Sequence, residues 1–92
     1  MYLVYVLVSQ RNGRYYVGYT GDMAVRLNQH NQGRVKSTRH LRPWEVVYTE
    51  KYGSSREARQ RERYLKSLKS RVAIRDLITR QGPVAQPVRA QS

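Results

Sequence analysis

The sequence predicts a single α+β domain in which a small sheet is covered by helices, with the element order ββαβαα. Two observations support this class. Short runs rich in β-branched and aromatic residues dominate the first half of the chain, and helix-capping residues precede periodic segments in the second half. A chain of 92 residues has room for one core, because folding at this size buries only about 60–65% of the surface that the unfolded chain exposes.

An N-terminal hairpin is the first predicted feature. Residues 2–8 form an apolar run typical of a buried strand. The dipeptide Asn12-Gly13 is a strong hairpin signal, because both positions accept positive φ. The return strand runs from Arg14 to Thr20, and Gly18 inside it indicates either a bulge or the close approach of another group to the backbone.

One helix and one further strand follow the hairpin. Asp22 is predicted to be the N-cap of the helix, and Gly33 to end it. Residues 34–43 contain four basic residues and a proline, so they predict a basic loop. The run from Trp44 to Tyr48 predicts the third strand.

Two helices are predicted in the C-terminal part of the chain. Ser54 and Glu57 have the spacing of a capping box, and the helix that they begin should run to about residue 69. Its apolar stripe consists of Ala58, Leu65 and Leu68. Ser70 is predicted to cap a further helix, whose apolar residues are Val72, Ala73, Ile74, Leu77 and Ile78.

The predicted domain ends near residue 82. The dipeptide Gly82-Pro83 stops the last helix. Residues 83–92 contain two prolines, no acidic residue and no apolar periodicity. We therefore expect residues 1–82 to form the folded domain and residues 83–92 to be a disordered tail.

The charge of the chain predicts a nucleic-acid partner. The 18 Lys and Arg residues against six Asp and Glu residues give a net charge of +12, and clustered basic charge of this size is typical of nucleic-acid-binding domains. The absence of cysteine excludes disulfides, thiolate metal sites and cysteine nucleophiles. The apolar run at residues 2–8 is too short to span a bilayer. We expect no membrane partner and a cytoplasmic location.

Three groups of residues are candidates for chemistry. Glu62 lies on or beside the apolar stripe of its helix, where it either forms a surface ion pair with Arg59 or Lys66 or binds one hard divalent cation. Arg26 and His30 share one helix face, which is either solvated or reaches one phosphate. The third group is tyrosines on the predicted hairpin, which are either core residues or carry functional hydroxyls: Tyr5, Tyr16 and Tyr19.

The ordered set of these residues resembles the GIY-YIG nuclease family. Val4-Tyr5-Val6 corresponds to the first motif, with Leu3 in place of the usual start, and Tyr16-Val17-Gly18 is close to the second. Arg26 and His30 on a helix and Glu62 on a later helix follow at matching positions. Further stretches are similar to the small stand-alone members of the family: residues 26–33, 42–44 and 61–71.

The resemblance implies a three-stranded antiparallel sheet flanked by helices and the hydrolysis of DNA phosphodiester bonds. It implies that Glu62 binds one Mg²⁺ or Mn²⁺ ion. Tyr5 is then the expected general base, with a pKa lowered from about 10 by the metal and Arg26, and His30 takes its proton or is itself the base. Tyr16 would orient water or phosphate, and Arg26 would stabilise the charge of the pentavalent state.

Two positions depart from the family pattern. Tyr19 stands where larger relatives have a lysine directly after the second motif. Some relatives have an asparagine about three helical turns after the glutamate, and here that region reads Val72-Ala73-Ile74-Arg75. A cationic phosphate contact is therefore missing or supplied elsewhere.

The expected function is that of a metal-dependent DNA endonuclease, with single-stranded or branched DNA favoured over plain duplex and a role in DNA repair or recombination. Specificity would come from the domain's own surface or from a protein partner. The alternative is a non-catalytic, basic nucleic-acid-binding protein that retains the fold. Exposed aromatic rings, with Tyr19 and Trp44 as candidates, would stack on bases. The expected nucleic-acid-binding residues are Tyr19, Arg34, Lys36, Arg39, Arg42, Lys66 and Lys69.

Overall fold

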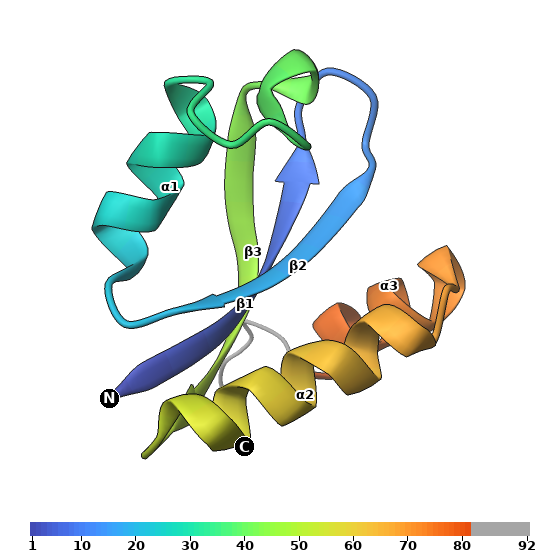
Figure 1. Cartoon of the computed structure of the whole chain (residues 1–92). Helices are drawn as coiled ribbons and strands as arrows, with labels where there is room; N and C mark the ends of the chain where they lie inside the picture. Colours follow the sequence, from blue (N-terminus) through green and yellow to red (C-terminus); the bar gives the residue numbers. More distant parts are fainter. Residues whose placement is uncertain (82–92) are drawn as a thin grey trace.

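A three-stranded antiparallel sheet forms the centre of the computed structural model, which describes residues 1–81 (Figure 1). The strands are β1 (Tyr2–Ser9), β2 (Tyr15–Thr20) and β3 (Trp44–Tyr52), in the spatial order β2-β1-β3. The helices are α1 (Met23–Asn31), the short 3₁₀ helix η1 (Arg39–Leu41), α2 (Ser55–Ser67) and α3 (Arg71–Gln81). The predicted α+β class and the order ββαβαα are confirmed. The domain end at residue 82 and the tail at residues 83–92 lie outside the described residues.

Helices cover both faces of the sheet, so β1 is buried on both sides. Val4 and Val6 point to the face covered by α2 and α3, where they pack with Ala58 and Leu65 of α2. Tyr5 points to the opposite face with Leu7 and Trp44, and side chains of α1 pack on this second cluster. Because strand residues alternate between faces, one central strand supplies both cores.

A β-bulge separates two registers between β1 and β3. Val6 lies opposite Tyr48, whereas Leu7 lies opposite Val46, so Val47 is the extra residue. β3 also continues to Tyr52, beyond the predicted end at Tyr48. Its second half contains charged residues that hide the strand pattern, but Glu50 is held there by hydrogen bonds from Tyr48, Tyr52 and Arg61.

The hairpin and α1 form as predicted, with one difference at the turn. β1 ends at Ser9 and β2 begins at Tyr15, so the connection is longer than a two-residue turn. Only Gly13 of the Asn12-Gly13 pair has positive φ, at 78°. The Asp22 side chain accepts a hydrogen bond from the backbone N–H of Val25, which confirms it as the N-cap of α1.

The predicted basic loop contains the 3₁₀ helix η1, because several hydrogen bonds fix the stretch between α1 and β3. Asn31 at the end of α1 pairs with both backbone groups of Trp44. The Trp44 indole N–H donates to the backbone oxygen of Thr38 at 2.9 Å. Ser9 Oγ donates to the backbone oxygen of Leu41. These contacts place Thr38 against α1.

The caps of α2 and α3 agree with the sequence. Ser54 Oγ accepts a hydrogen bond from the Glu57 N–H, and Ser70 Oγ accepts one from the Ala73 N–H. α2 ends at Ser67, two residues before the expected position. Val72, predicted on the apolar side of α3, is instead 54% exposed.

Candidate active site

The Tyr5 ring lies across the backbone of Gly18, its cross-strand neighbour in β2. A Cβ atom on Gly18 would lie 2.6 Å from Tyr5 Cζ and nearer still to the hydroxyl. Of the two predicted reasons for this glycine, close approach is therefore correct, and the approaching group is the Tyr5 side chain. The glycine fixes the position of the Tyr5 hydroxyl on the α1 face of the sheet.

His30 connects the Tyr5 hydroxyl to the segment after α1. Its Nε2 lies 2.9 Å from Tyr5 Oη, and its Nδ1 lies 2.8 Å from Thr38 Oγ1. The Thr38 hydroxyl also points at the backbone oxygen of Val35, at 3.4 Å. If it donates there, His30 Nδ1 carries the ring proton and Nε2 accepts from Tyr5; this tautomer is assigned from the hydrogen-bond network.

Burial keeps the His30 ring neutral. The side chain is fully buried, and this desolvation, followed by the charge of Arg26, lowers the pKa of His30 to about 4. One of the two alternatives for this helix face was that it is solvated, and that alternative is wrong for His30. At neutral pH the unprotonated ring nitrogen, Nε2, faces the Tyr5 hydroxyl.

Arg26 places a guanidinium beside the same hydroxyl. Its Nε donates to Tyr5 Oη at 3.3 Å, and its Nη1 donates to Gln29 Oε1 at 3.0 Å. The i, i+4 spacing predicted from the sequence therefore brings Arg26 and His30 to one oxygen atom. Arg26 is only half-buried, so its guanidinium lies between Tyr5 and the surface.

Tyr5 is fully buried, and its pKa is raised, not lowered. Loss of hydration on burial is the largest cause and outweighs the hydrogen bond and charge of Arg26, while the charge of Glu62 adds a smaller increase. The expectation that Tyr5 ionises readily is therefore wrong for the protein without a metal ion. Its hydroxyl keeps its proton at neutral pH.

Tyr16 and Lys66 extend this cluster toward α2. The Tyr16 ring centroid lies 5.2 Å from that of His30 and 6.5 Å from that of Tyr5. Lys66 Nζ lies 5.3 Å from the Tyr16 ring centroid and 3.3 Å from Glu62 Oε2. The i, i+4 ion pair that the sequence left open for Glu62 is present, and its cation lies over a ring of the site.

The donor set fits a single hard cation at Glu62. Among residues 1–81, no three His, Cys, Asp or Glu side chains cluster as a multi-ligand metal site would. Mg²⁺ requires only one or two carboxylates when waters and a substrate phosphate complete its shell. The Glu62 side chain is 17% exposed, so its carboxylate has access to solvent beside the Lys66 ammonium.

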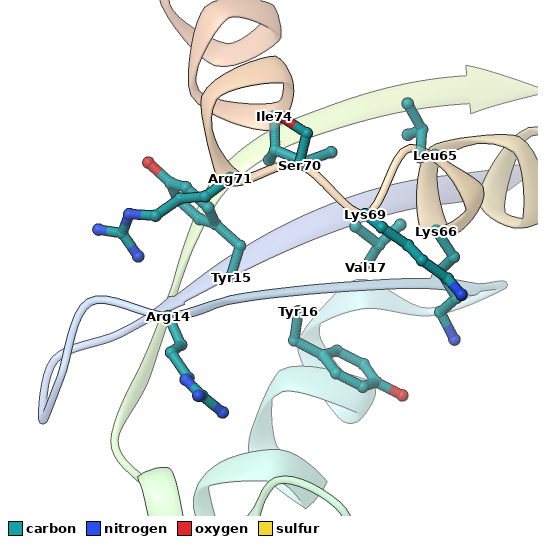
Figure 2. A pocket seen from close by; sticks show the side chains of 10 residues that line it. All are labelled: Arg14, Tyr15, Tyr16, Val17, Leu65, Lys66, Lys69, Ser70, Arg71 and Ile74. Atoms are coloured by element: carbon teal, nitrogen blue, oxygen red, sulfur yellow. The ribbon is translucent and has the colours of Figure 1, made fainter.

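The predicted nucleic-acid-binding residues fall into two places. Arg34, Lys36, Arg39 and Arg42 are exposed in the segment between α1 and β3. Lys66 and Lys69 line a groove between β2 and the junction of α2 with α3 (Figure 2). Trp44 is 4% exposed, so its predicted role in base stacking is wrong, and Tyr19 is half-buried against the core.

Two contributors to the site were missed from the sequence. Thr38 hydrogen-bonds His30 across a loop, and no local pattern marks it. Arg14 joins Lys66 and Lys69 in the groove, because β2 passes beneath the end of α2.

Residues 1–75 match the family model described as the GIY-YIG catalytic domain. No helix within residues 1–81 has the length and apolar character to cross a bilayer.

Curated relatives of this chain are small, single-domain proteins of the UPF0213 group. The chain is 37% identical over 65 residues to UPF0213 protein YazA of Bacillus subtilis, a match covering 70% of this chain and 66% of the relative. It therefore spans just under two-thirds of the length of that protein. It is 41% identical over 69 residues to a UPF0213 protein of Halobacterium salinarum, covering 74% of this chain and 88% of the relative.

One solved structure has a similar fold. It is a solution NMR structure of a UPF0213 protein from Bacillus halodurans, with 34% sequence identity and a TM-score of 0.57. The match covers 89% of this chain and 87% of that chain. The three-stranded sheet followed by helices is therefore shared with a relative of known structure.

Proposed function

The chain belongs to the GIY-YIG catalytic domain family, and we propose that it is a metal-dependent endonuclease that hydrolyses phosphodiester bonds of DNA. The observation that carries this proposal is that His30 and Arg26 both contact the hydroxyl oxygen of Tyr5. The Tyr16 ring lies against that of His30. These residues come from β1, β2 and α1, and Glu62 joins them from α2. A core needs no such set, because packing alone favours apolar side chains.

The proton path runs from water through Tyr5 to His30. As the water oxygen attacks phosphorus, Tyr5 Oη accepts the water proton and passes its own proton to His30 Nε2. The phenol therefore never needs to ionise in isolation, which accommodates its raised pKa. His30 Nε2 is unprotonated at neutral pH, because the pKa of His30 is about 4, so it has room for this proton.

Substrate binding must uncover Tyr5, because its side chain is fully buried. Arg26 is the more exposed of the two side chains that bond the Tyr5 hydroxyl. A phosphate at the surface would draw the Arg26 guanidinium outward, since charge-assisted bidentate contacts to phosphate are strong. The same movement stabilises the extra negative charge of the pentavalent state.

Glu62 would hold one Mg²⁺ or Mn²⁺ ion, and Lys66 would turn from Glu62 to the substrate backbone. When bound, such an ion offsets charge on the phosphate and stabilises the leaving oxygen. Tyr16 is half-buried with Lys66 over its ring, and its hydroxyl would orient water or phosphate at this edge of the site.

Single-stranded or branched DNA is the proposed substrate, with the exposed arginines and lysine between α1 and β3 as further backbone contacts. The rival function is that of a nucleic-acid binder without activity. That reading accounts for the charge but gives no reason for the buried Tyr5–His30–Thr38 chain of hydrogen bonds.

A panel of end-labelled single-stranded, flapped and duplex DNAs, incubated with Mg²⁺ or Mn²⁺ and with EDTA, tests the proposal. We expect cleavage of single-stranded or flapped DNA that EDTA stops. If the protein binds these DNAs and cleaves none of them with either metal, the binder is the correct function.

A further inference from the structure

A groove of about 590 Å³ lies between β2 and the junction of α2 with α3. Its basic lining residues are Arg14, Lys66, Lys69 and Arg71, and Tyr15 and Tyr16 form part of its wall. In Figure 2 the Lys66 and Lys69 side chains extend over β2 on the side of Tyr16, and Arg71 lies with Tyr15 at the other end. The groove is therefore basic along its length.

The charge of the groove has little internal compensation. No Asp or Glu is among the residues that line it. Of its four cations, Lys66 pairs with Glu62, and Arg71 donates to the backbone oxygen of Gly13. Arg71 also covers the Tyr15 ring at 5.2 Å. Four positive charges along one groove attract a polyanion more strongly than a single anion.

Lys69 adds an independent observation, because its backbone is in the left-handed region. Its φ is 46°, in the α2–α3 junction where glycine is the favoured residue. A lysine here carries a backbone cost that glycine avoids. The chain thus has a cation at a position where glycine would fit the backbone better, and the Lys69 side chain lines the groove.

The groove continues directly from the candidate active site. Tyr16 and Lys66 belong to both, since Tyr16 contacts the His30 ring and Lys66 pairs with Glu62. We propose that this groove binds the backbone of a single-stranded polynucleotide segment next to the phosphodiester bond that is cleaved. This proposal rests on the proposed nuclease function and deepens it.

In this groove the cationic side chains, and not exposed faces of the tyrosine rings, would contact the polynucleotide. Arg71 covers Tyr15 and Lys66 covers Tyr16, so phosphates meet the cations on the rings. Recognition in this groove should therefore be independent of base sequence. A single strand is the favoured occupant, because a recessed groove between a strand and a helix junction admits one backbone more readily than a duplex.

Binding measured in EDTA tests the groove separately from cleavage. The probes are fluorescein-labelled twelve-residue oligothymidylate, the matching oligouridylate and a hairpin duplex, followed by anisotropy. We expect Lys69→Gly and Arg14→Gln to weaken oligothymidylate binding by about threefold to tenfold each. Each change should also reduce the slope of log K against log salt by about 0.7. Arg80→Gln, which removes one exposed charge outside the groove, is the matched control and should change binding by less than twofold.

Lys69→Gly also separates binding from folding, because it relieves the left-handed strain. Its Tm should equal or exceed that of the unaltered protein while its affinity falls. The proposal would be overturned if Lys69→Gly and Arg14→Gln bound oligothymidylate as tightly as Arg80→Gln and the unaltered protein do. If the two variants lost affinity only for the hairpin duplex, the groove would be assigned to duplex DNA. If the unaltered protein bound oligouridylate more tightly than oligothymidylate, the groove would be assigned to RNA. Groove binding without cleavage in metal would contradict the nuclease function but leave the groove assignment intact.

Discussion

Replacement of Tyr5 by phenylalanine removes one oxygen atom from the centre of the proposed proton path. That oxygen accepts a hydrogen bond from Arg26 Nε at 3.3 Å and lies 2.9 Å from His30 Nε2. The ring and its contact with Gly18 remain. The change therefore tests the hydroxyl and not the packing of the strand.

The stability cost follows from what the substitution leaves behind. Arg26 is half-buried and can bond water, but His30 is fully buried and its Nε2 loses its partner. An unsatisfied buried polar atom costs about 1–3 kcal/mol. A domain with a stability of about 5–15 kcal/mol stays folded after such a loss. Cleavage should fall far more, by at least about 10²-fold, because the general base is lost.

The assay compares initial cleavage rates with unfolding in urea for Tyr5→Phe, Tyr16→Phe and Tyr2→Phe. Tyr2 is half-buried on the same strand, outside the cluster, and its replacement is the matched control that should leave both quantities nearly unchanged. Tyr16→Phe should lower the rate less than Tyr5→Phe. A wild-type rate for Tyr5→Phe together with a large loss for Tyr16→Phe would refute the relay and assign the base to the more exposed phenol.

Three further perturbations have outcomes fixed by the structure. The pKa of His30 is about 4 in the folded protein and about 6.5 in the unfolded chain, so the unfolded chain binds the proton first as the pH falls. The free energy of unfolding should therefore fall by roughly 3 kcal/mol from pH 7 to pH 4. Urea titrations at both pH values, with His30→Gln as the reference, measure this. Gly18→Ala should force the Tyr5 ring aside, costing about 1–3 kcal/mol by urea unfolding and most of the cleavage rate. Glu50→Ala should cost about 2–3 kcal/mol by the same measurement, since it strands the Tyr48 hydroxyl and the Arg61 guanidinium.

The polar network around Glu50 shows why part of β3 escaped prediction. Burial alone would raise the pKa of Glu50, but hydrogen bonds from Arg61, Tyr48 and Tyr52 outweigh it and lower that pKa. These partners come from a strand and a helix that meet only in the folded chain. In sequence, Glu50 and Lys51 interrupt the apolar and aromatic run, so the predicted strand ended at Tyr48.

Features with local causes were predictable. The caps at Asp22, Ser54 and Ser70 depend on residues three positions away, and all three are present. The helical spacing of Arg26 and His30 likewise placed both side chains at one site. These signals need no knowledge of the tertiary fold.

Burial and long-range contacts at the site were not predictable in the same way. Nothing near His30 in sequence indicates that Thr38 will bond its Nδ1. Trp44 was expected at the surface, yet its ring fills the α1 face of the sheet. The raised pKa of Tyr5 also depends on how completely the fold removes water from its hydroxyl.

Cleavage and binding by Glu62→Gln, measured on one labelled single-stranded DNA in the same samples, test the central claim most directly. The substitution keeps the size of the side chain and removes the charge that would hold the metal ion. We predict that the unaltered protein cleaves with Mg²⁺ or Mn²⁺, whereas Glu62→Gln binds the DNA at least as tightly and leaves it intact. Cleavage by Glu62→Gln at the rate of the unaltered protein would contradict a metal-dependent nuclease centred on Glu62.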